Sequence, residues 1–373
     1  MSSVYKTFAP EDITNSKTLL YENIPITGSI LSGTYGESNI LKYTHGMFQT
    51  IHDYPYASSS ANNLFDLTLG YNSASPAYGT NSSYNTKKSN IYYQLAKVLV
   101  GHDQTGSIYK FDEDGNYASS NDKINEAFFL TFSRILVKDE IKKGSFSMIV
   151  GAGNAGRDSV FSSVFSIVDA SGTTSYNTNS PVGEYGILYA DGAALDSGQT
   201  DKKVGLIFYQ AGVAVINSNI FTKYSAGTSP SGSITGLSGS YRGQLTAAAE
   251  MYNTTGTFGY LGKALVSGSI NDVGDALRTR IENINFQNTT ELNSTIYFVR
   301  VNNNEFNYSS NPTYLSGSQI IVKGGDRTAS PVTYITTAGL YSPDNELLAV
   351  AKLSEPIKKT ADQSLLLRVR LDY

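Results

Sequence analysis

The spacing of turn-forming residues restricts the C-terminal part of this chain to a β-rich fold. From residue 281 onward, short apolar runs are separated by turns that contain Asn, Gly or Pro. In the final run, Leu367, Val369 and Leu371 alternate with charged residues, and a period of two is typical of a strand with one buried face. The pattern predicts strands at 281–286, 294–301, 319–322, 333–337, 347–353 and 364–372.

Comparable strand patterns occur earlier, at 145–150, 160–168 and 185–189, with a hairpin formed by 204–209 and 213–216. Residues 126–135 fit either a helix or a strand buried on both faces, and a strand followed by a helical turn at 137–141 is the favoured interpretation. Helical spacing is clearest at 89–100, with Ser89 as the expected cap and Gly101 just after its end. Further helices are predicted at 271–280 and 244–251. We therefore predict a mainly β chain of β-sandwich-like domains with a few short helices, the best of them at 89–100 and 271–280.

A chain of 373 residues exceeds the usual size of one domain, so more than one is expected. Residues 1–25 read as an extended N-terminal arm, and 26–155 as a β-rich domain with one helix. Residues 156–265 read as a β-rich domain with a Gly/Ser/Thr loop at 225–240, and the alternative that it is an inserted domain stays open. Residues 266–373 form a C-terminal β domain.

Composition excludes several classes of chemistry. The chain has no cysteine and three histidines, so disulfides, cysteine-bound metals and cysteine nucleophiles are ruled out. Its formal charge of −4 does not suit a surface that binds nucleic acid. Charged residues make up 16%, while the 27 tyrosines favour contact surfaces. The start of the chain shows no apolar leader, and the apolar stretch 204–221 fits a hairpin better than a membrane span.

A glycine motif, Gly151–Gly156, matches the G-x-G-x-x-G pattern of dinucleotide sites, and Asp169 ends a later apolar run. Such a site needs a helix directly after the glycines. The residues from 160 to 168 favour a strand instead and leave no room for a crossover helix. A glycine-rich β-turn is therefore the favoured interpretation.

Residues 112–115 read Asp-Glu-Asp-Gly and suggest a calcium loop. An EF-hand loop needs Gly at its sixth position and Glu at its twelfth, where this chain has Tyr117 and Lys123. A hairpin turn is favoured, with an irregular surface calcium site left open.

The remaining motifs are weaker. Residues 236–239 lack the spacing of a serine nucleophile elbow, and His45 and His52 lack the spacing of a helical metal motif. The glycosylation triplets at Asn253, Asn288 and Asn307 are expected by chance in a chain this rich in Asn, Ser and Thr. The sequence thus nominates no catalytic, cofactor-binding or metal-binding residue.

The C-terminal part of the chain contains the run YITTAGLYSPDNELLAVAKLSEPIKK at 334–359. This run resembles virion structural proteins of large contractile-tailed bacteriophages. The segment 126–151, with Phe-Ser-Arg at 132–134 and Lys-Asp-Glu-Ile at 138–141, is similar to an upstream part of the same group.

This resemblance implies a non-enzymatic component of the virion, assembled in the host cytoplasm and without cofactors. We expect a place in the tail baseplate or fibre-attachment region. The expected partners are other virion subunits and further copies of the chain, and neither nucleic acid nor membrane. Two alternatives stay open: a head or neck decoration or collar protein, and a module that binds a receptor or glycan through its tyrosines or the loop at 225–240.

Overall fold

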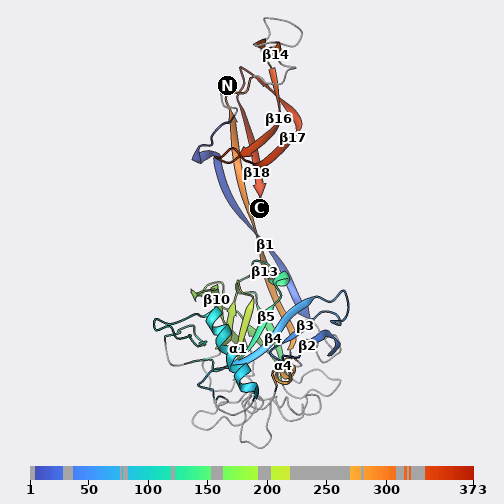
Figure 1. Cartoon of the computed structure of the whole chain (residues 1–373), viewed down its shortest axis with the longest axis vertical. Helices are drawn as coiled ribbons and strands as arrows, with labels where there is room; N and C mark the ends of the chain where they lie inside the picture. The colour runs from blue at the N-terminus through green and yellow to red at the C-terminus, as the bar shows by residue number, and fades with distance from the viewer. Residues whose placement is uncertain are drawn as a thin grey trace, which may run out of the picture. The chain divides into compact units, whose positions relative to one another are not determined.

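The structure of the protein is a computed structural model that describes a defined set of residues. They are 5–27, 37–75, 78, 83–118, 122–152, 163–191, 203–218, 269–278, 281–307, 315–316, 319–320 and 332–373. The chain forms two compact units. The central unit comprises Tyr21–Thr290, and the terminal unit combines Met1–Leu20 with Glu291–Tyr373. Both consist mainly of β-strands, which confirms the predicted fold class (Figure 1).

One large antiparallel sheet dominates the chain. In spatial order its main path is β1 (Ile13–Thr27), β13 (Ile281–Val301), β7 (Ser147–Ala152), β8 (Ser163–Val168), β10 (Gly183–Asp191), β11 (Lys203–Phe208), β12 (Val213–Asn217), β5 (Glu126–Phe132), β4 (Asn63–Tyr71), β3 (Gln49–His52) and β2 (Ile40–Lys42). Three strands pair beside this path: β18 (Leu365–Asp372) and β6 (Glu140–Ile141) with β13, and β9 (Asn177–Ser180) with β10.

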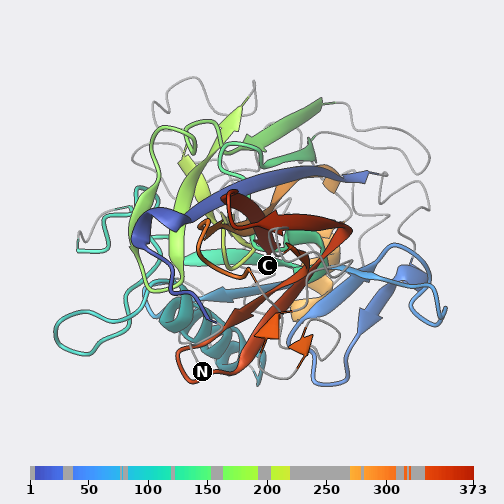
Figure 2. The same cartoon turned by 90° about the horizontal axis from the view of Figure 1, so that it is seen from above.

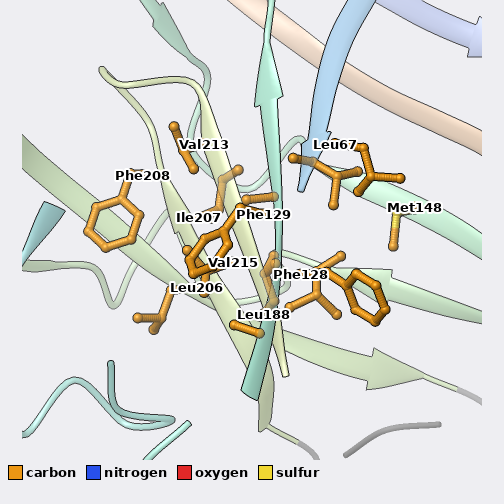
Figure 3. Packing of buried hydrophobic residues seen from close by; sticks show 14 of the residues in the cluster. Leu67, Phe128, Phe129, Met148, Leu188, Leu206, Ile207, Phe208, Val213 and Val215 are labelled. Carbon is orange, nitrogen blue, oxygen red and sulfur yellow. The ribbon is translucent and has the colours of Figure 1, made fainter. Parts of the chain in front are cut away.

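The core of the central unit follows from its most apolar strand, β5. This strand lies between β4 and β12, and nearly all of its side chains are buried because both of its faces are covered. Phe128 and Phe129 point to opposite sides of the strand and are fully buried (Figure 3). Leu206 and Val215 from the neighbouring hairpin extend the same cluster. The predicted hairpin of β11 and β12 is thereby confirmed.

The two helices predicted most clearly, at 89–100 and 271–280, are confirmed. Helix α1 spans Ser83–Leu99 and lies along the strands of the central unit (Figures 1 and 2), and α4 spans Ile270–Arg278. Helix α1 begins before the predicted residue, so Ser89 lies inside it and caps nothing, whereas Gly101 has the expected positive φ of 82°. Gly70 of β4 allows α1 to pack closely, because a Cβ there would lie 2.6 Å from the carbonyl oxygen of Lys88.

Shorter helical segments occur in both units. The helical turn predicted at 137–141 lies a few residues earlier, as α2 (Arg134–Val137). Two 3-10 turns, η1 (Pro10–Asp12) and η2 (Glu37–Asn39), precede β1 and β2, so η1 belongs to the terminal unit. The helix predicted at 244–251 and the loop at 225–240 lie outside the described residues.

In the terminal unit, β18 pairs along the last part of β13, from Val301 opposite Leu365 to Ser294 opposite Asp372. A separate hairpin consists of β16 (Val332–Tyr341) and β17 (Leu347–Thr360). A small pair, β14 (Leu315–Ser316) and β15 (Gln319–Ile320), completes the elements.

Two strands differ from the predicted lengths. The strands predicted at 281–286 and 294–301 form a single strand, β13. Strand β13 pairs in turn with β7, β6 and β18, and the polar residues between the two predicted strands stay extended where Asn288 and Thr289 pair with β6. Strand β17 runs past 353 through Pro356, and it accommodates this proline at a register shift between Ile335 and Thr337 of β16.

The division into compact units also differs from the predicted domain boundaries at 25, 155 and 265. The extended arm 1–25 includes most of β1, which pairs with β13 of the same chain. Strand β12, from the predicted domain 156–265, pairs with β5, from the predicted domain 26–155, so both belong to one core. Local composition does not reveal such pairing between distant segments.

Candidate assembly surface

The terminal unit has very little core of its own. Among its described residues, Val301 and Leu367 are the buried hydrophobic side chains, whereas every member of the main hydrophobic cluster belongs to the central unit. Most of the exposed large hydrophobic residues of the described chain lie in the terminal unit, although it is the smaller of the two. Where exposed apolar residues of this kind form a contiguous patch, the patch is a candidate interaction site.

The outer layer of the terminal unit carries one apolar patch, which we call the hairpin face. It consists of Tyr341 of β16 and Leu347, Leu348 and Val350 of β17, together with Tyr5. Leu348 is 63% exposed and Val350 54%. The ring of Tyr5 lies 4.9 Å from that of Tyr341, in an edge-to-face arrangement.

Local sequence explains how the hairpin face forms. Gly339 lies beneath the ring of Tyr341, and a Cβ there would come within 2.9 Å of that ring, so the glycine allows the tyrosine to lie flat. The turn that follows places Asn345 at a φ of 63°, a left-handed conformation that Asn tolerates well. The same turn presents the exposed acids Asp344 and Glu346 beside Leu347. The hairpin face is therefore apolar with an acidic rim at one end.

A second exposed face lies on the other layer of the same unit, and we call it the arginine face. Residues 369 and 371 of β18 line the interior, so the alternating residues Leu366, Arg368 and Arg370 point to the opposite side. Phe298 pairs with Arg368 and Ile296 with Arg370, which places both apolar side chains on this face. Leu366 is 60% exposed.

The cations of the arginine face differ in what they contact. Arg370 Nε donates to Asp372 Oδ1 at 2.6 Å, and Arg300 Nε donates to Asp12 Oδ1 at 2.5 Å. Arg368 is exposed and makes no ion pair with the described residues of the chain. Its charge is available to an external partner.

The two layers of the terminal unit pack loosely. An apolar cavity of about 30 Å³ lies between them, lined in part by Val299 and Val369 from one layer and by Ala338, Ala349 and Ala351 from the other. Alanine side chains are too short to fill the space between two sheets, which are normally about 10 Å apart. Phe8, Tyr297 and Leu340 also line the cavity, but on β17 the small residues Ala349 and Ala351 face it while Leu348 and Val350 point outward.

Ion pairs hold the N-terminal segment in the terminal unit. Lys6 Nζ lies 2.7 Å from Glu305 Oε2, and Lys17 Nζ lies 2.5 Å from Glu291 Oε1. The hydrogen bond from Arg300 lowers the pKa of Asp12, and the bond from Lys6 lowers the pKa of Glu305. These ion pairs join the N-terminal segment to residues of β13 and to Glu305, and partly exposed pairs of this kind contribute little stability each.

The suspected calcium loop contains an internal cation instead. Lys123 Nζ donates to Asp112 Oδ2 at 2.7 Å and to the carbonyl oxygens of Asn116 and Tyr117 at 3.1 and 3.2 Å. Asp112 is fully buried, and its other oxygen accepts the backbone N–H groups of Asp114 and Asn116. The lysine predicted to break the calcium pattern thus provides the positive charge, and residues 112 and 123 form an antiparallel bridge, as in a hairpin.

The glycine motif is in a context that does not suit a dinucleotide. Its first residue, Gly151, belongs to β7, which pairs antiparallel with β8, whereas a dinucleotide unit has parallel strands joined by a helix. Residues 153–160 lie outside the described residues. Asp169 has a structural role: it accepts hydrogen bonds from Gly144 N at 2.7 Å and from Tyr209 Oη at 2.8 Å, and burial raises its pKa.

The histidines lie apart from one another. His45 stacks on Tyr43 with ring centroids 5.0 Å apart, and its Nδ1 accepts the backbone N–H of Met47, whereas His52 is in β3. Within the described parts of the chain, no group of three or more His, Asp or Glu side chains could hold a metal ion.

Two of the three glycosylation triplets have structural roles. Asn288 is buried and donates to the carbonyl oxygen of Leu136, and Asn307 accepts a hydrogen bond from Lys359. The third, at Asn253, and the serine motif at 236–239 lie outside the described residues.

No protein family, curated protein or solved structure matches this chain. Among the helices that the structure describes, none is long and apolar enough to span a membrane.

Proposed function

We propose that this chain is a non-enzymatic structural component of a tailed-phage virion, in the tail baseplate or fibre-attachment region, where it acts as an assembly or adaptor protein. The observation that carries the proposal is the exposed apolar surface of the terminal unit, which is typical of a surface that binds another protein. The run that resembles tailed-phage virion proteins, 334–359, is most of the β16–β17 hairpin that presents this surface.

The proposal is tested on purified particles. Mass spectrometry should detect the chain in mature virions, and symmetry-resolved imaging should place it in the tail. A chain absent from the particles would refute the proposal. A position on the head or neck would favour the alternative of a decoration or collar protein.

A second candidate, a receptor- or glycan-binding module, is favoured by one loop of the central unit. Tyr54 and Tyr56 are 58% and 48% exposed. Asp53 accepts the backbone N–H groups of Tyr54 and Asn62 at 2.8 and 2.7 Å, which orders the loop that presents these rings. If this loop binds sugar, replacing both tyrosines by alanine should reduce adsorption of particles to host cells; unchanged adsorption would reject it.

A further inference from the structure

The two exposed faces of the terminal unit belong to opposite layers of one thin β structure. The hairpin face is on the outer side of β16 and β17, and the arginine face is on the outer side of β13 and β18. A single partner that covered one face would leave the other exposed. Both faces are covered at once if each is the partner of the other in a neighbouring copy.

Charge supports this pairing. The hairpin face combines Leu348 and Val350 with the acidic residues Asp344 and Glu346 at one end. The arginine face combines Leu366 with cations, of which Arg368 has no ion pair among the described residues. An apolar patch with an acidic rim complements an apolar patch with a basic rim, and such complementarity fixes the orientation of an interface. Lys352 also lies on the hairpin face, beyond Val350, at the end away from the acidic turn.

From these observations we infer that the hairpin face of one copy of this chain packs on the arginine face of the next copy. The inference rests on the proposed assembly function and specifies its contact. Because the two faces are on opposite layers, the contact is head-to-tail rather than two-fold. Repeated head-to-tail contacts close into a ring of three or more copies when the rotation between neighbours permits closure.

The loose packing between the layers is consistent with this arrangement. In a single copy Leu348 and Val350 of β17 point outward, and Ala349 and Ala351 of the same strand point inward. Cover of the two outward residues by a neighbouring copy would remove more apolar area from water than the two inward alanines bury. A side chain that faces solvent in one copy is then part of the interior of the assembly.

A charge exchange in the full-length chain tests the contact. Glu346→Arg and Arg368→Glu should each lower the association constant about tenfold or more, because each places like charges opposite one another. The double variant should restore association to within about threefold of the wild type, because the exchanged charges attract again. Sedimentation velocity at micromolar concentration measures the association, and the wild-type assembly should have at least three times the 40.3 kDa mass of the chain.

Two further variants complete the experiment. Leu348→Asp should lower association roughly 100-fold, as expected for a buried residue at the centre of an interface. Lys97→Glu, a charge reversal at an exposed position of α1 in the central unit, should leave association unchanged. Far-UV circular dichroism confirms that each variant is folded, and rescue by the double variant would itself show that neither single change prevents folding.

Three results would overturn the inference. They are a monomeric wild type, an assembly that neither charge reversal weakens, and a dimer that is sensitive to Glu346→Arg but not to Arg368→Glu. The last result would mean that two hairpin faces pair with each other. None of these results bears on whether the chain occurs in purified particles, so a failure of the contact and a failure of the proposed function can be distinguished.

Discussion

In the central unit Phe128, Phe129 and Leu206 are fully buried, whereas in the terminal unit Leu348 and Leu366 remain more than half exposed. The two units are parts of one chain, and both are built from antiparallel strands. They differ in how many layers cover their apolar residues. Central strands such as β5 have neighbours on both edges and cover on both faces, but the hairpin of β16 and β17 has its outer side exposed.

This difference shows that one strand-forming pattern can lead to two outcomes. The central unit has a complete hydrophobic core and is stabilised mainly by apolar burial. The terminal unit has few buried apolar residues and contains ion pairs such as those of Lys6 and Asp12, and its larger apolar side chains, such as Leu348, face solvent. The contrast between the two units can be tested in the isolated chain.

The largest expected effect is in the central core. Phe129→Ala should lower the free energy of unfolding by about 3–5 kcal/mol, because it leaves a cavity in a fully buried cluster. Leu348→Ala, at a residue 63% exposed, should change it by less than about 0.5 kcal/mol when the chain is kept dilute enough to be monomeric. Urea denaturation measures both values. Equal costs at the two sites would show that the hairpin face is already buried within a single chain.

The next largest effect on the free energy of unfolding is expected at Lys123, the internal cation of the loop that contains Asp112. Lys123→Met should cost about 3 kcal/mol, because it leaves the buried carboxylate of Asp112 without its partner. The double variant with Asp112→Asn should cost less than the sum of the two single variants. Additive costs in denaturant unfolding would show that the two groups do not depend on each other.

One carboxyl group in each unit, Asp12 and Glu126, should make stability depend on pH with opposite signs. In the terminal unit the pKa of Asp12 is lowered by its hydrogen bond from Arg300, so its contribution is present above the ordinary pKa of 3.8 and is lost as the pH falls through the lowered value. In the central unit burial raises the pKa of Glu126 above 4.5, so its contribution is present below 4.5 and is lost as the pH rises through the raised value.

Two neutral variants, compared with the wild type by thermal unfolding over a pH series, measure these signs. Asp12→Asn should be less stable than the wild type at pH 7, and the difference should shrink on acidification. Glu126→Gln should equal or exceed the wild type at pH 7, and the wild type should gain relative to it as the pH falls. If the difference between each variant and the wild type is the same at every pH, these carboxyl groups do not make the assigned contributions.

Much of the fold could be predicted from the sequence, because the periodicity that marks a strand or helix depends only on residues close together in the chain. The alternation in β18 and the apolar run in β5 identified those strands, and Gly101 identified the end of α1. The continuity of β13 could not be predicted, because its polar middle is extended only through pairing with strands distant in the sequence. The two compact units were missed for the same reason.

The sequence of β17 also contains a pattern that indicates the candidate surface. In the run ELLAVAKL both phases of the strand are mainly apolar: Leu348 and Val350 share one phase with Lys352, and Ala349 and Ala351 share the other with Leu347 and Leu353. A register shift opposite Tyr341 then brings Leu347 to the hairpin face. A strand with two apolar phases predicts cover on both sides. The sequence does not tell which phase the chain itself covers. The structure shows that it is the alanine phase, and this outcome left the larger residues exposed.

The smallest expected effect concerns the turn that shapes the hairpin face. Asn345 adopts a φ of 63°, and the backbone N–H of Ser342 donates to the carbonyl oxygen of Glu346 at 2.9 Å across the turn. A β-branched side chain is strained at such a φ, so Asn345→Val should lower stability by about 1–2 kcal/mol, whereas Asn345→Gly should be nearly neutral. Because the turn also sets the position of Glu346, the valine variant should weaken self-association as well, which sedimentation would detect. If the valine variant loses stability and yet associates as the wild type does, the acidic turn is not part of the contact, and the apolar residues of β17 alone would define the hairpin face.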